Sequence, residues 1–115
     1  MMVQPLFFLP CPPHYFTNCY FVHKGDRPLV VQFAATNAHD FASAAELVAP
    51  FTDGVDLNCG CPQRWALAEG YGAALLHNPE LIADMVAQAR ACSSLPVSIK
   101  IRIHTDLRYG VYIEV

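Results

Sequence analysis

Three short apolar runs alternate with two segments of helical periodicity, and this alternation limits the fold more than any other feature. The runs are residues 29–35, 54–58 and 97–103, and a proline or glycine opens each of them. Strands that alternate with helices are joined by crossovers, which place the strands parallel in one sheet. The sequence therefore predicts an α/β fold with about three consecutive β/α units.

Each helical segment has its own start or stop signal. Pro50 ends the first pattern, while Asn78 is the expected N-cap of the second, with Pro79 at its first helical position. Glu69–Leu76 is expected to begin a further helix with closely packed glycines. The apolar faces are Phe41, Ala44, Ala45 and Val48 in the first helix, and Leu81, Ile82, Met85, Val86 and Ala89 in the second.

The composition is unusually apolar for a chain of 115 residues, of which 54% are hydrophobic. A short chain has much surface for its volume, so this predicts a piece of a larger core or strands buried on both faces. Charged residues make up 15%, which argues against disorder. The net charge is −3 without a cluster of Lys or Arg, so contacts with nucleic-acid phosphates must be local or come from elsewhere.

The cysteine count and the N-terminus indicate the compartment. An odd number of cysteines argues against a disulfide framework. The apolar start lacks a cationic segment and is broken by prolines, unlike a secretory signal, and no apolar run is long enough to span a bilayer. We therefore expect a reduced cytoplasmic protein, or a nuclear one, without membrane association. The five cysteines are Cys11, Cys19, Cys59, Cys61 and Cys92.

Polar residues share one face of each predicted strand, because side chains alternate across a strand. One interpretation is a structural ion pair between Asp56 and either Lys100 or Arg102, with the amides bonded to backbone. The other is a functional site, since polar groups converge at the carboxyl ends of parallel strands. Three consecutive strands with this pattern favour the site. The residues are Gln32 on the first strand, Asp56 and Asn58 on the second, and Ser98, Lys100 and Arg102 on the third.

The turn after the second strand contains two thiols, for which three interpretations compete. In the first interpretation both cysteines are small buried apolar groups. In the second they bind metal, although C-x-C is not the usual zinc spacing. In the third interpretation the turn presents a catalytic thiol, because Gly60 permits close approach and Pro62 fixes the exit. A thiol that is mostly protonated at neutral pH can donate a proton as a general acid, or attack after deprotonation.

A separate zinc site can be drawn near the N-terminus. Prolines surround its four candidate ligands, and their spacing matches no familiar zinc-binding pattern. The sequence therefore predicts no metal. The candidate ligands are Cys11, His14, Cys19 and His23.

The block "GVDLNCGCPQRWALAEGYGAALL", flanked by "RPLVVQFAA", "NPEL" and "VSIKIRI", resembles the tRNA-dihydrouridine synthases. The resemblance is to the branch that acts at positions 20a and 20b of the tRNA D-loop. It implies an FMN-binding TIM (β/α) barrel, represented here by part of its first half. It also implies that NAD(P)H is the reductant and that uridine in tRNA becomes 5,6-dihydrouridine.

The resemblance also implies roles for individual residues. Cys61, in "GCP", matches the cysteine that donates a proton to the uracil, whereas Cys59 is left as a packing residue. Gln32 and Lys100 match residues that bind FMN, and Asn58 matches a residue beside the substrate uracil. The remaining cation, Arg102, contacts flavin or a phosphate, or forms the ion pair described above.

The resemblance extends over residues 25–107. We expect residues 1–24 to be an irregular segment outside the family and residues 108–115 to be a divergent tail. A complete barrel needs about 250 residues, so the chain is expected to be a truncated form of the enzyme. The alternative is an inactive fragment or isoform that binds no flavin of its own. Open sheet edges predict self-association.

Overall fold

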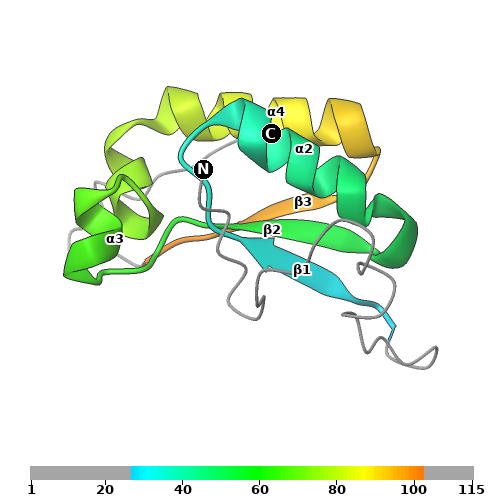
Figure 1. Cartoon of the computed structure of the whole chain (residues 1–115), viewed down its shortest axis with the longest axis horizontal. Coiled ribbons are helices and arrows are strands. Elements are labelled where there is room, and N and C mark those ends of the chain that lie inside the picture. Colours follow the sequence, from blue (N-terminus) through cyan, green and yellow to red (C-terminus); the bar gives the residue numbers. More distant parts are fainter. Residues whose placement is uncertain (1–26, 103–115) are drawn as a thin grey trace.

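A computed structural model describes residues 27–102 of the chain. The predicted zinc ligands near the N-terminus and the end of the third apolar run lie outside the described residues. The elements, in chain order, are β1 (Val30–Phe33), α2 (Ala38–Val48), η2 (Ala49–Phe51), β2 (Gly54–Asn58), α3 (Arg64–Ala68), η3 (Gly72–His77), α4 (Pro79–Ser93) and β3 (Val97–Lys100), where η marks a 3-10 helix (Figure 1).

The three strands form one parallel sheet in the order β1-β2-β3, so the predicted α/β fold is confirmed. The register aligns Gln32 with Asp56 and aligns Asp56 with Ser98. One row of polar residues therefore crosses all three strands at the same height. Asn58 and Lys100 form a second row nearer the carboxyl ends.

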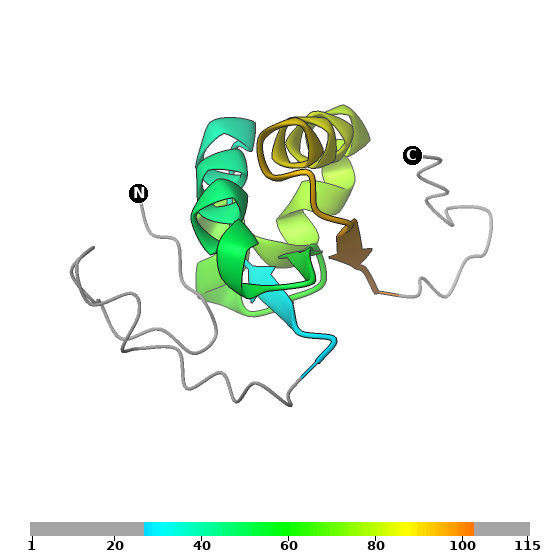
Figure 2. The same ribbon diagram turned by 90° about the vertical axis from the view of Figure 1, so that its right-hand side faces the viewer.

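Helices α2 and α4 lie side by side on one face of the sheet (Figures 1 and 2). Val55 and Leu57 of β2 point into the layer between sheet and helices, and Phe33 meets Phe41 edge-to-face with ring centroids 6.3 Å apart. The predicted apolar faces of both helices are confirmed, because their side chains lie in this core. Their burial stabilises the packing of the helices on the sheet. Those that are fully buried include Phe41, Ala45, Val48, Ile82, Met85, Val86 and Ala89.

Asparagine side chains begin both long helices. Asn78 accepts a hydrogen bond from the Leu81 N–H at 3.1 Å, which confirms the predicted N-cap of α4. The Asn37 side chain caps α2 in the same way, through the Asp40 N–H at 2.9 Å. These caps supply acceptors for backbone N–H groups that have no partner within the helix.

The region between the cysteine turn and α4 differs from the prediction. The short helix α3 was not predicted, and the residues after it form the 3-10 helix η3 instead of an α-helix beginning at Glu69. The physical reason is the backbone at Gly70 and Gly72, which have φ values of +85° and +62°. Such left-handed conformations interrupt an α-helix. The outer strands are also shorter than expected.

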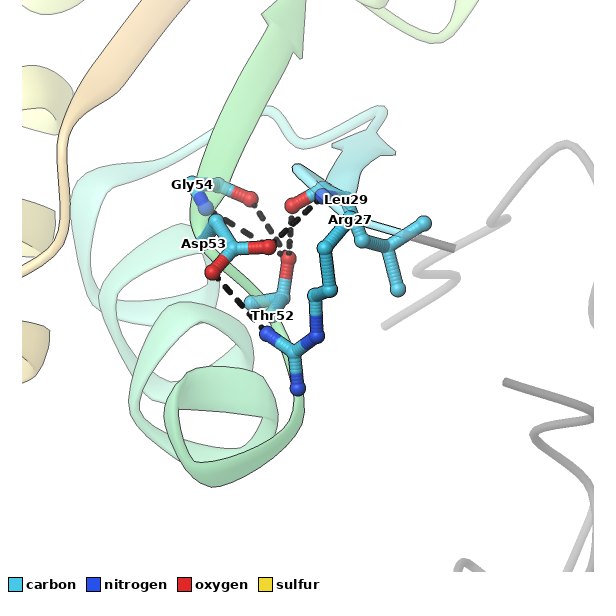
Figure 3. A network of polar contacts seen from close by, with 5 residues as sticks. All are labelled: Arg27, Leu29, Thr52, Asp53 and Gly54. Atoms are coloured by element: carbon cyan, nitrogen blue, oxygen red, sulfur yellow. Dashed lines mark hydrogen bonds and ion pairs between the residues drawn. The ribbon is translucent and has the colours of Figure 1, made fainter. Parts of the chain in front are cut away.

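A group of polar contacts lies where β1 and β2 begin (Figure 3). The Asp53 carboxylate accepts from the Leu29 N–H at 2.7 Å and from the Arg27 guanidinium at 2.9 Å. The Thr52 hydroxyl lies within hydrogen-bonding distance of the carbonyl oxygens of Leu29, at 2.7 Å, and Gly54, at 2.9 Å. These contacts tie the loop before β2 to the start of β1, at the end of the sheet away from the cysteine turn.

Candidate functional site at the carboxyl end of the sheet

The face of the sheet opposite α2 and α4 bears the polar residues predicted from strand alternation. Gln32 and Asp56 are half-buried and Asn58 is buried, while Ser98 and Lys100 are exposed. Among the described residues, no acceptor contacts the Lys100 ammonium group. The structure therefore brings the candidate residues of all three strands onto one surface.

A chain of hydrogen bonds connects the three strands on this face. The Asp56 carboxylate accepts from Ser98 Oγ and from Gln32 Nε2, both at 2.6 Å. The other end of the Gln32 amide, Oε1, accepts from Asn58 Nδ2 at 3.2 Å. Side chains of β1, β2 and β3 thus form one continuous network.

The network ends at the backbone of the cysteine turn. Asn58 Oδ1 accepts from the N–H groups of Gly60, at 3.0 Å, and Cys61, at 3.1 Å. Only 6% of the Asn58 surface is exposed. The predicted contact between Asn58 and a substrate remains a prediction, but within the chain this amide holds the turn.

Neighbouring segments fix the cysteine turn from other sides. The Cys59 N–H donates to the Lys100 carbonyl oxygen at 2.8 Å, which continues the pairing of β2 and β3. The Arg102 guanidinium lies 3.4 Å from the Gly60 carbonyl oxygen, and the Cys61 carbonyl oxygen accepts from the Ala73 N–H at 3.0 Å. The position of the turn is therefore determined by residues far apart in the sequence.

Gly72 lies directly against Cys61. A Cβ placed on Gly72 would be 2.7 Å from both the Cβ and the carbonyl oxygen of Cys61. Real Cβ atoms essentially never come this close to other heavy atoms, so only glycine fits. The close glycine packing predicted for this segment is confirmed at Gly72, which packs against the turn at Cys61.

The two thiols of the turn have different environments. Cys59 follows the alternation of β2 into the core and is completely buried, as expected of a packing residue. Burial, and to a smaller extent the Asp56 carboxylate, raise the pKa of the Cys59 thiol to about 12. Cys61 is half-buried, so this residue is accessible in part where Cys59 is not.

The alternative interpretation, a structural ion pair between Asp56 and either Lys100 or Arg102, is not what residues 27–102 form. Asp56 is bonded to the neutral side chains of Gln32 and Ser98, and in residues 27–102 the ion pair that forms joins Arg27 to Asp53 instead. Within residues 27–102, Lys100 is exposed and forms no ion pair.

Two contributors to the site were not recognised from the sequence. Strand alternation placed Ser98 on the polar face, but nothing in the sequence indicated that it bonds Asp56. The pattern "GYG" indicated close packing, but not that Gly72 packs on Cys61. Both contacts depend on how separate segments come together in space.

Comparisons of the sequence with known proteins identify the family. The sequence model of the family described as "Dihydrouridine synthase (Dus)" matches residues 11–114. The chain belongs to the dihydrouridine synthase family. The matched range begins before residue 25 and ends after residue 107, so it is wider than the segment in which the sequence showed the resemblance.

The relatives include proteins named tRNA-dihydrouridine(20a/20b) synthase [NAD(P)+]-like. The human protein is 56% identical over 92 residues, which are 77% of this chain and 29% of the relative. The mouse protein is 58% identical over 88 residues, which are 74% of this chain and 27% of the relative. The tRNA-dihydrouridine(20a/20b) synthase of Schizosaccharomyces pombe is 40% identical over 87 residues, which are 74% of this chain and 27% of the relative. The chain thus spans less than a third of the length of these relatives.

Among residues 27–102, no helix combines the length and apolar character needed to cross a membrane.

Proposed function

We propose that this chain carries part of the active site of a tRNA-dihydrouridine synthase, with Cys61 as the proton donor. The observation that supports this most directly is the presentation of an accessible thiol on a turn whose N–H groups are held by Asn58. The substrate is uridine in the D-loop of tRNA, by analogy with the names of the relatives. We also propose that the protein acts in the cytoplasm or nucleus, where tRNA is present.

The residues on the open face fit an FMN cofactor. Each amide has two donor hydrogens and two acceptor lone pairs, so Gln32 retains one of each after its bonds to Asp56 and Asn58. Lys100 adds a positive charge without an acceptor among the described residues. Gln32 and Lys100 would hold the polar edge of the flavin, which when bound supplies hydride to the uracil, with NAD(P)H as the reductant.

The chemical task of Cys61 is the transfer of a proton from Sγ to C5 of the uracil ring. A neutral thiol donates this proton and becomes a thiolate, which takes up a proton from solvent before the next cycle. The fixed turn limits the directions in which the side chain can point. Arg102, beside the Gly60 carbonyl oxygen, is placed to contact a phosphate or the flavin.

We also propose that the three strands belong to the first half of a TIM barrel. In such a barrel the helices form the outer layer, the opposite face of the sheet points inward, and the active site lies at the carboxyl ends of the strands. α2 and α4 on one face, polar residues on the other and Cys61 after β2 agree with this arrangement. Further strands would cover the open face.

The test is formation of dihydrouridine on tRNA by the enzyme that contains this chain, supplied with FMN and NAD(P)H. Cys61→Ala should lower product formation by at least about 100-fold while flavin binding persists, because a general acid contributes about 10²–10⁴-fold. Cys92→Ala, a change of an exposed cysteine on α4, is the matched control and should leave turnover unchanged.

Two results would count against the proposal. Normal turnover by the Cys61→Ala variant would exclude the role of this thiol. Absence of both bound flavin and product in the unchanged protein would favour the alternative of an inactive fragment.

A further inference from the structure

We propose that Asp56 is a positioning residue that acts through Gln32 and Asn58 to fix the backbone of the turn at Cys61. Asp56 lies far from the thiol along the network, and no role in the reaction was implied for it by the family resemblance. The significance of this role for catalysis rests on the proposed function of Cys61.

The first step of the argument is the orientation of the Gln32 amide. A carboxylate accepts hydrogen bonds and has none to donate, so the amide end that faces Asp56 must be the NH₂ group. The 2.6 Å contact from Gln32 Nε2 to Asp56 Oδ2 meets this requirement, and Ser98 holds the second carboxylate oxygen at 2.6 Å. The oxygen of the Gln32 amide is thereby directed toward Asn58.

The second step is the orientation of Asn58. Because Gln32 presents an oxygen, Asn58 must present its NH₂ group to Gln32 and its own oxygen to the turn. That oxygen accepts from both Gly60 N–H and Cys61 N–H. Reversal of either amide would place donor against donor, so the carboxylate at one end and the backbone N–H groups at the other require the same polarity.

The burial of the network strengthens this coupling. Asn58 is buried, and Gln32 and Asp56 are half-buried, so water can replace lost partners only in part. A buried donor or acceptor without a partner is unfavourable, so loss of the carboxylate should loosen the bonds at the far end of the series.

The test measures hydrogen exchange of individual backbone amides by NMR. Asp56→Leu, similar in size but without acceptors, should speed exchange of the Gly60 and Cys61 N–H groups about five- to ten-fold, the effect of one hydrogen bond. Exchange in α4 should not change. The matched control is Asp84→Leu, which removes another carboxylate–amide pair, with Gln88 on α4, and should leave Gly60 and Cys61 unaffected.

A double-mutant cycle tests whether Asp56 acts through Asn58. In an Asn58→Ala background, Asp56→Leu should cause no further change at Gly60 and Cys61, because the route between them is already broken. A purely structural effect of Asp56 would instead add to the effect of Asn58→Ala. Additive changes would overturn the proposal.

Gln32→Met is the second variant, in case Asp56→Leu prevents folding. It leaves Asp56 bonded to Ser98 but removes the connection to Asn58, and should speed exchange at Gly60 and Cys61 to the same extent. Unchanged exchange at both amides, with α4 still protected, would overturn the proposal. Neither result affects the role of Cys61, which product formation by Cys61→Ala tests separately.

Discussion

At the scale of the residue, the two thiols of one turn differ because the alternation of β2 continues as far as Cys59. Cys59 therefore points into the core with Leu57, whereas Cys61 lies beyond the strand, where Asn58 and Gly72 shape the backbone. The sequence spacing of these cysteines suggests a pair. Their environments separate them into a packing group and an accessible thiol.

Thiol labelling should distinguish the two cysteines. The thiolate is the reactive form, and a pKa raised to about 12 together with complete burial keeps Cys59 protonated and inaccessible. In the folded protein near pH 8, we expect iodoacetamide to modify Cys61 and Cys92 but to modify Cys59 only after unfolding. Peptide mass spectrometry identifies the labelled sites. Rapid labelling of Cys59 in the folded protein would contradict the described packing.

Gly72→Ala should destabilise the protein more than Gly70→Ala. Both glycines have positive φ, which costs an alanine about 1–2 kcal/mol. At Gly72 the new Cβ would also meet Cys61 at 2.7 Å, whereas at Gly70 the nearest atom, of Thr36, is 3.8 Å away. We expect a total loss of more than about 2 kcal/mol for Gly72→Ala, measured by urea unfolding. Equal losses for the two variants would mean that no clash occurs.

At the scale of the element, the two ends of the sheet have different tasks. The amino end of β1 and β2 is tied by Asp53 and Thr52, and these contacts involve no residue of the candidate site. The carboxyl end holds the cysteine turn and the polar network. In parallel α/β folds this separation leaves one end for stability and the other for chemistry.

Asp53 should make stability depend on acidic pH. The Leu29 N–H and then the Arg27 guanidinium hold the pKa of the Asp53 carboxyl below its usual value. The folded pKa is therefore below the unfolded one, so this stabilisation is complete above about pH 4 and is lost as pH falls through the folded pKa. Asp53→Asn should lower the urea midpoint at neutral pH and have a smaller effect near about pH 3.

The non-titrating neighbour provides the control for this prediction. Thr52→Val removes the hydroxyl contacts to Leu29 and Gly54, so it should lower the midpoint similarly at both pH values. The difference in urea midpoint between Asp53→Asn and the unchanged protein should shrink at acidic pH. If it does not, the Asp53 carboxylate is not the source of the difference.

At the scale of the whole molecule, the described residues form two layers, a sheet and the helices on one of its faces. Parallel sheets usually have both faces covered. The sheet order leaves β1 and β3 as edges, and on the open face 55% of the Val30 surface is exposed. The high hydrophobic content agrees with strands that pack against further structure. Exposed strand edges are also templates for pairing between chains.

We therefore expect the isolated chain to self-associate and to bind FMN weakly. Val30→Lys should reduce association, since a charge on an edge strand opposes pairing. Leu47→Lys, on an exposed position of α2 away from the sheet, is the control and should leave association unchanged. Analytical ultracentrifugation and flavin absorbance measure the two properties. A monomeric chain with stoichiometric flavin would contradict this prediction.

Much of the fold could be predicted because its signals are local. Asn78 and Pro79 begin α4, the spacing from Phe41 to Val48 defines the buried face of α2, and strand alternation places the polar residues. The helix α3 was not predicted, because short helices have weak periodicity. An α-helix was expected where the 3-10 helix η3 forms, and the two differ because the conformation at Gly72 depends on its close contact with Cys61.

The sequence by itself determined the order of strands and helices, the faces of the strands and the position of the thiol, since each follows from periodicity along the chain. Only the tertiary structure decided the partners. It joined Asp56 to Gln32 and Ser98 instead of a cation, and it brought Gly72 against Cys61. The physical reason is that hydrogen-bond partners depend on the register between strands and on close contacts between distant segments, neither of which periodicity specifies.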